Sequence, residues 1–82
     1  MYTIYAIYNR ENNKIYIGQT ANLKDRIRMH NEGTLGGYTS RFDGKWEVVY
    51  HEEVLTRTEA LTREKQLKSY RGREFVRTHI PL

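Results

Sequence analysis

The segment YTIYAIYNRENNKIYIG, residues 2–18, carries the clearest secondary-structure signal in the chain. Residues 2–8 alternate in type and are rich in Tyr and Ile, which is typical of a β-strand. Asn12-Asn13 tolerates a left-handed backbone and favours a turn, and residues 14–18 return to β-type side chains. The segment therefore predicts a hairpin closed by a two-residue turn at Asn12-Asn13.

That turn predicts which side chains of the hairpin share a face of the sheet. It pairs Asn9 with Tyr16 and Ile7 with Gly18. Tyr5, Ile7, Tyr16 and Gly18 then lie on one face, where the glycine leaves room for another group to approach the backbone. Ordinary sheet packing is the simpler interpretation of two tyrosines in strands. The other face is predicted to hold Tyr2, Ile4, Ala6, Tyr8, Ile15 and Ile17.

Further along the chain the pattern alternates between helix and strand. Asn22 and Thr56 are the expected N-caps of two helices, with Glu59 completing a capping box, and Gly33 is the expected C-terminal stop of the first. The predicted elements are a helix over 23–30, a mobile loop over 33–45, a strand over 46–53, a helix from 58 to about 70 and a short helix over 73–80. The order β-β-α-β-α predicts an α+β fold, in which helices flank a small three-stranded antiparallel sheet.

Composition limits the class of protein. The chain has 82 residues, so we expect a single domain over residues 1–82, small enough that homodimerisation would help its core. The absence of Cys excludes disulfides, iron–sulfur clusters and a thiol nucleophile. We find no signal peptide or spanning segment and expect a cytoplasmic protein without a membrane partner. Fourteen basic against ten acidic residues favour a polyanionic partner, nucleic acid first.

Each main helix places a polar side chain on a face that we expect to be buried. His30 shares a helical stripe with apolar residues, and Arg26 lies at the margin of that stripe. A partly buried His beside a snorkelling Arg is the simpler interpretation. Glu64 projects among Ala60, Leu61 and Leu67, where an ion is costly unless it is paired or metal-bound. An i, i+4 pair with Lys68 and a Mg²⁺ ligand are both open interpretations of Glu64.

Taken together, these residues resemble the GIY-YIG nuclease superfamily, in the manner of its small stand-alone bacterial members. Thr3-Ile4-Tyr5 is similar to the first tripeptide with its Gly replaced, and Tyr16-Ile17-Gly18 is the second, intact. The stretch from Tyr16 to Arg26 is similar to the one that ends in the family's catalytic Arg, and His30 falls where many members carry a His. Residues 60–64 (ALTRE) resemble the helix that carries the metal-binding Glu. Unlike many larger members, the chain has Gln19 after the second tripeptide and no Asn beyond Asn31.

The resemblance implies a metal-dependent endonuclease that hydrolyses phosphodiester bonds in DNA with one Mg²⁺ or Mn²⁺ ion. Glu64 would hold the metal, and Arg26 would bind the scissile phosphate. Tyr16 would orient or deprotonate the attacking water. Tyr5 and His30 would fix that water and tune Tyr16, with His30 able to relay a proton.

Two groups of side chains are candidates for contacts with nucleic acid. The loop offers aromatic, hydroxyl and guanidinium groups, and the second helix offers basic ones, although both regions are also compatible with plain solvated surface. We see no sequence-reading element, so substrate shape or a protein partner would supply specificity, on branched or single-stranded DNA or on RNA. The candidates are Tyr38, Thr39, Arg41, Arg63, Lys65 and Lys68.

Two other functions fit the same sequence. One is a nucleic-acid-binding module that keeps the fold with little or no activity, which Gln19 and the missing downstream Asn favour. The other is a protein-binding adaptor in which the Tyr and Arg side chains form an interface. A test of cleavage and of nucleic-acid binding separates all three.

Overall fold

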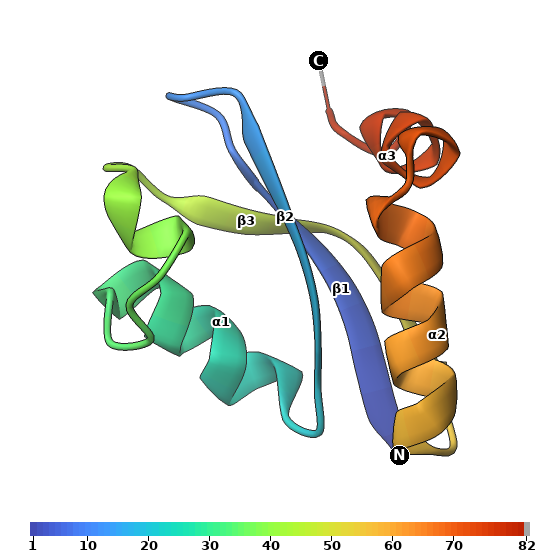
Figure 1. The fold of residues 1–82 in the computed structure, drawn as a ribbon. Helices are drawn as coiled ribbons and strands as arrows, with labels where there is room; N and C mark the ends of the chain where they lie inside the picture. Colours follow the sequence, from blue (N-terminus) through green and yellow to red (C-terminus); the bar gives the residue numbers. More distant parts are fainter. Residues whose placement is uncertain (82) are drawn as a thin grey trace.

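A computed structural model describes residues 1–81 of the chain and confirms the α+β fold. Its three strands form one antiparallel sheet in the order β2-β1-β3. Figure 1 shows α1 on one side of this sheet and α2 with α3 on the other. The elements are β1 (Tyr2–Asn9), β2 (Lys14–Thr20), α1 (Leu23–Glu32), the 3₁₀ helix η1 (Thr39–Arg41), β3 (Trp46–Val54), α2 (Arg57–Lys68) and α3 (Tyr70–Arg77).

The predicted register of the hairpin is wrong by two residues. Tyr5 pairs with Gly18 and Ile7 with Tyr16, which leaves residues 10–13 as the connection. The turn is longer because the buried Asn9 organises it: Asn9 Oδ1 accepts from the Asn12 backbone N–H at 3.0 Å. A shift of two residues leaves every side chain on its predicted face, because side chains alternate along a strand.

Capping residues set the helix boundaries, and several predicted boundaries change: α1 ends at residue 32 rather than 30, α2 begins at 57 rather than 58, and α3 ends at 77 rather than 80. Asn22 and Thr56 cap α1 and α2 as expected, and Gly33 ends α1 in the left-handed region at φ 73°. α2 was predicted to reach about residue 70 but ends at Lys68, because Ser69 caps the end of α2 and the start of α3. α3 therefore begins earlier than predicted, and part of the predicted loop forms η1.

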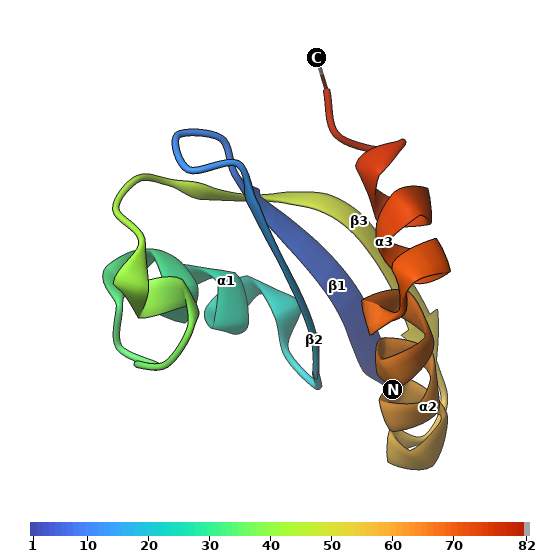
Figure 2. The ribbon, with the colours of Figure 1, turned by 45° about the horizontal axis from the view of Figure 1, so that its top comes forward.

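The sheet is packed on both faces. On the α2 and α3 side, Ala60, Leu67 and Val76 pack in one core with Ile4 and Ala6 of β1. Leu61, predicted to belong to this core, is 45% exposed. On the other side, Leu23 and Ile27 of α1 pack against a second core of Tyr5, Ile7 and Trp46. In Figure 2 the segment that contains η1 lies beside α1 on this same side.

Within residues 1–81, none of the helices combines the length and the apolar character that a membrane crossing requires.

Candidate active site

A chain of side-chain hydrogen bonds lies between the sheet and α1. Tyr5 Oη is 2.8 Å from His30 Nε2, and His30 Nδ1 is 2.9 Å from Thr39 Oγ1. All three side chains are buried, with 1%, 5% and 3% of their surface exposed. In a neutral imidazole one nitrogen donates and the other accepts, so Tyr5 and Thr39 must play opposite hydrogen-bonding roles toward the ring.

Burial also determines the charge states of the hydrogen-bonded His30 and Tyr5 side chains. Burial lowers the pKa of His30, and the positive charge of Arg26 lowers it further. Burial raises the pKa of Tyr5, and its proximity to Tyr16 and Glu64 adds to that rise, against the opposing effect of Arg26. His30 is therefore neutral and Tyr5 keeps its proton at neutral pH. Tyr5 can position other groups, but it is not a base.

Tyr16 differs from Tyr5 because it reaches solvent. It is partly exposed, and with Arg26 and His30 it lines a cavity of about 230 Å³ that residues 35–39 close on the loop side. The Tyr16 ring centroid is 5.0 Å from that of His30 and 6.3 Å from that of Tyr5. Of the two tyrosines on this face, Tyr16 is the one whose phenol a water molecule or a phosphate can reach.

Gly18 allows the two tyrosines to lie this close. A Cβ atom at Gly18 would lie 2.7 Å from Tyr5 Oη and 3.0 Å from Tyr16 Cε2. The sequence predicted that this glycine leaves room for another group, and the structure identifies that group as the Tyr5 side chain. A side chain at residue 18 would therefore push one of the two rings out of place.

Glu64 belongs to α2, which lies on the opposite side of the sheet from α1. Its side chain is 20% exposed, and Lys68 Nζ is 3.7 Å from its Oε2, so the i, i+4 contact forms but is long. Glu64 does not line the cavity of Tyr16, Arg26 and His30. Its negative charge nevertheless contributes to the raised pKa of Tyr5.

A divalent metal would have to bind here with few protein ligands. Within the described residues, no group of three or more His, Asp or Glu side chains could hold a metal ion alone. Mg²⁺ usually keeps several waters and takes one or two carboxylates plus phosphate oxygens of the substrate. The loosely held Glu64 carboxylate fits that coordination, since a bound substrate would supply the remaining oxygens.

Comparison with protein families gives this arrangement a name. Residues 1–75 match the model of the GIY-YIG catalytic domain. The chain belongs to the GIY-YIG family. Its tripeptide tyrosines, Tyr5 and Tyr16, are the two that meet beside His30 on the α1 face of the sheet.

Two curated relatives are small proteins named UPF0213. The one from Oceanobacillus iheyensis is 37% identical over 54 residues, which cover 66% of this chain and 62% of the relative. The one from Haloquadratum walsbyi is 39% identical over 56 residues, which cover 68% of this chain and 62% of the relative. The matched stretch thus spans less than two thirds of either relative. No solved structure matches the chain.

The candidate nucleic-acid contacts of this GIY-YIG domain lie in different environments. Tyr38 is 41% exposed and stacks on Tyr16, with ring centroids 6.2 Å apart and planes at 25°. Thr39 is buried against His30, so its hydroxyl acts inside the site. Arg63 Nε donates to Glu52 Oε1 at 2.8 Å. Arg41, Lys65 and Lys68 are exposed.

Asn31, which no motif in the sequence marks, fixes the loop that carries Thr39. Its side-chain amide accepts from the Trp46 backbone N–H at 2.8 Å and donates to the Trp46 carbonyl at 3.1 Å. Trp46 Nε1 in turn donates to the Thr39 carbonyl at 3.3 Å. Asn31 is exposed, so the apolar stripe of its helix does not include it. Its position directly after His30 is the one sequence feature that could have pointed to a role near the site.

Proposed function

We propose that this GIY-YIG domain is a divalent-metal-dependent endonuclease that hydrolyses phosphodiester bonds in DNA and selects its substrates by structure rather than by sequence. The supporting observation is that Tyr16, Arg26 and His30 line one cavity, while Tyr5 is buried behind them and hydrogen-bonded to His30. This combines an accessible phenol and a guanidinium with a rigid, uncharged support. The net charge of +4 suits a polyanionic substrate.

Each side chain of the site has a distinct task in this proposal. Arg26 binds the scissile phosphate through paired N–H groups and stabilises the charge that builds up on it. Tyr16 Oη accepts a hydrogen bond from the attacking water and so orients it. Neutral His30 and protonated Tyr5 hold the Tyr16 ring from behind. Glu64 would hold one Mg²⁺ or Mn²⁺ ion, which supplies Lewis acidity at the phosphate.

Replacing Glu64 tests this function most directly. Glu64→Gln keeps the shape of the side chain and removes its charge, so cleavage should fall roughly 10³-fold or more, since bound metal contributes several kcal/mol. The assay would incubate flapped, single-stranded and duplex DNA with Mg²⁺ or Mn²⁺. Glu59→Gln, an exposed position on the first turn of the same helix, is the matched control and should cleave like the wild type.

Two outcomes would contradict the proposal. Cleavage by Glu64→Gln at the wild-type rate would remove the metal-binding role of this carboxylate. Salt-sensitive DNA binding by the wild type, without cleavage of any of these substrates, would instead assign the domain to a binding module. A thermal denaturation curve for each variant would show that the fold is intact.

A further inference from the structure

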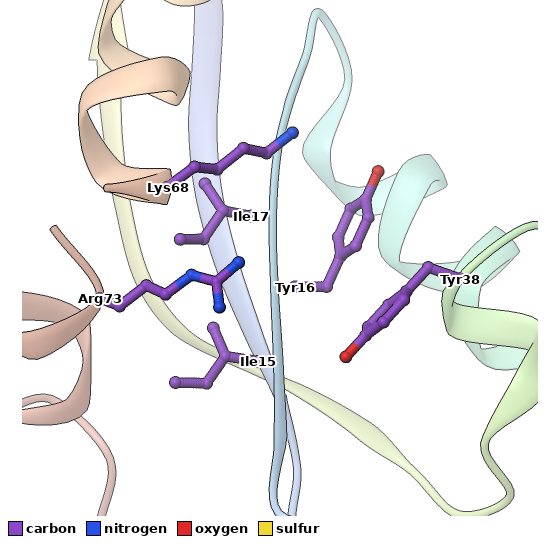
Figure 3. A pocket seen from close by; sticks show the side chains of 6 residues that line it. All are labelled: Ile15, Tyr16, Ile17, Tyr38, Lys68 and Arg73. Atoms are coloured by element: carbon purple, nitrogen blue, oxygen red, sulfur yellow. The ribbon is translucent and has the colours of Figure 1, made fainter. Parts of the chain in front are cut away.

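A groove beside the candidate active site crosses the edge strand β2. It has a volume of about 300 Å³ and is lined by side chains from both faces of that strand. Ile15 and Ile17 lie on one side of β2 and Tyr16 lies on the other, as Figure 3 shows. Because β2 is an edge strand, no further strand from residues 1–81 covers this side of the sheet. Tyr16 belongs to both the groove and the cavity of the active site.

One wall of the groove is aromatic. Tyr38 stacks nearly parallel to Tyr16 and keeps 41% of its surface exposed. An exposed aromatic ring of this kind is a platform on which a nucleobase stacks, at about 1–3 kcal/mol per base.

The opposite wall is cationic. Lys68 comes from the end of α2 and Arg73 from α3, and both side chains extend toward β2 in Figure 3. Arg73 is exposed and forms no ion pair with any other residue in 1–81. Lys68 has only the long contact with Glu64. An unpaired guanidinium beside an ammonium group is well suited to bind a phosphate.

Gly72 explains why these two cations come together. A Cβ atom at Gly72 would overlap the carbonyl oxygen of Gln66 and the backbone of Leu67. The absence of a side chain therefore lets α3 pack directly on the last turn of α2. The next residue, Arg73, is thereby brought to the same groove as Lys68.

We propose that this groove binds one unpaired nucleotide of the substrate strand, next to the phosphate held at Arg26. The base would stack on Tyr38, and the phosphate would bind Arg73 and Lys68, with the sugar over Ile15 and Ile17. Both faces of a base inside a duplex are covered by its neighbours, so only a base outside the stack can reach Tyr38. A volume of about 300 Å³ suits one nucleotide rather than a duplex.

This inference rests on the proposed function for the position of the cleaved bond, but its test does not require cleavage. Fluorescence anisotropy in EDTA would measure binding of a labelled single strand of six thymidines and of a labelled twelve-base-pair duplex. Tyr38→Ala and Arg73→Ala should each weaken binding of the single strand about tenfold, whereas Tyr38→Phe should bind like the wild type.

Arg71→Ala is the matched control. Arg71 lies on the same helix and carries the same charge, but it is about 200° around the helix from Arg73 and does not line the groove. Its loss should weaken binding of the single strand less than about threefold. On the duplex, the Arg71 and Arg73 variants should lose affinity equally, because only general electrostatic attraction remains.

Two results would overturn the subsite. One is equal loss of single-strand affinity in the Arg71 and Arg73 variants, and the other is unchanged affinity in Tyr38→Ala. Either result would leave the endonuclease proposal standing. Conversely, if the protein cleaves none of the DNA substrates but its variants show the expected pattern of affinities in EDTA, the subsite proposal stands and the endonuclease proposal does not. The altered side chains are exposed, so circular dichroism should show that every variant is folded.

Discussion

Successive side chains of each strand point to opposite faces of the sheet, and the two faces bury different types of side chain. The α2 and α3 face buries aliphatic side chains, including Ile4, Ile17 and Leu67. The α1 face buries Tyr5 and Trp46. It also holds all the buried polar side chains of residues 1–81: Asn9, Thr20, His30 and Thr39.

This difference separates stability from function. Apolar burial stabilises a domain without specific geometry, whereas a buried polar group is costly unless it is hydrogen-bonded. Within residues 1–81 no buried side-chain nitrogen or oxygen lacks a partner. The α1 face therefore holds its side chains in defined positions, as a catalytic site requires. Substitutions on the aliphatic face should change stability, and those on the polar face should change activity.

The largest effect is expected from Leu67→Ala on the aliphatic face. Leu67 is 1% exposed, so the substitution should lower the free energy of unfolding by about 2–5 kcal/mol. Urea denaturation measures this loss. The cleavage rate per folded molecule should stay within about threefold of the wild type, because Leu67 does not touch the site.

Leu61→Ala on the same helix is the control for that prediction. Leu61 is 45% exposed, and its truncation should cost less than about 1 kcal/mol. Equal losses at the two positions would mean that the core on this face is not the one described. A large drop in the cleavage rate of folded Leu67→Ala would contradict the separation of the two faces.

A smaller effect on stability, but a larger one on activity, is expected from Thr39→Val. The change keeps the shape of the side chain and removes the hydroxyl, which leaves buried His30 Nδ1 without its partner. That loss should cost about 1–3 kcal/mol of stability. Because Thr39 positions His30, the cleavage rate should also fall about tenfold.

Two measurements separate positioning from simple destabilisation. Thr39→Ser keeps the hydroxyl and should restore both the rate and the ¹⁵N chemical shifts of the His30 ring. Thr39→Val should move those shifts, since the tautomer of an imidazole depends on what its other nitrogen contacts. Unchanged shifts with a normal rate in Thr39→Val would show that Thr39 does not position His30.

Local signals made much of the fold predictable. Asn22, Thr56 and Gly33 are capping residues whose effect depends only on their neighbours, and the structure confirms all three. The faces of the hairpin followed from the alternation of side chains. The register did not, because Asn9 also donates to the Asp43 carbonyl at 2.9 Å, and no local rule predicts a contact with a residue that far along the chain.

The candidate site divides in the same way. Tyr5, Tyr16 and His30 lie together, as expected, because the periodicity of each strand or helix predicts the face on which its side chain lies. The bond from His30 to Thr39 could not be predicted, because it depends on the path of residues 33–45. That path is fixed by hydrogen bonds from the side chains of Asn31 and Trp46 to backbone groups, and these leave no pattern in the sequence.

The smallest expected effect is a dependence of stability on pH. It should arise from His30, and substitutions on the aliphatic face should not change it. Burial and the charge of Arg26 lower the pKa of His30 in the folded state, whereas in the unfolded chain it is about 6.5. Between the two pKa values the unfolded state binds the extra proton. The free energy of unfolding should therefore rise with pH through this window and level off above about pH 6.5.

Urea denaturation between pH 5 and 7.5 would measure this slope in four proteins. His30→Gln should reduce the slope, and His51→Gln, at an exposed position, should keep it. Leu67→Ala should keep the slope at a lower overall stability, because its loss is apolar and independent of protonation. A slope that survived in His30→Gln, or one that vanished in Leu67→Ala, would mean that the pH response does not belong to the polar face.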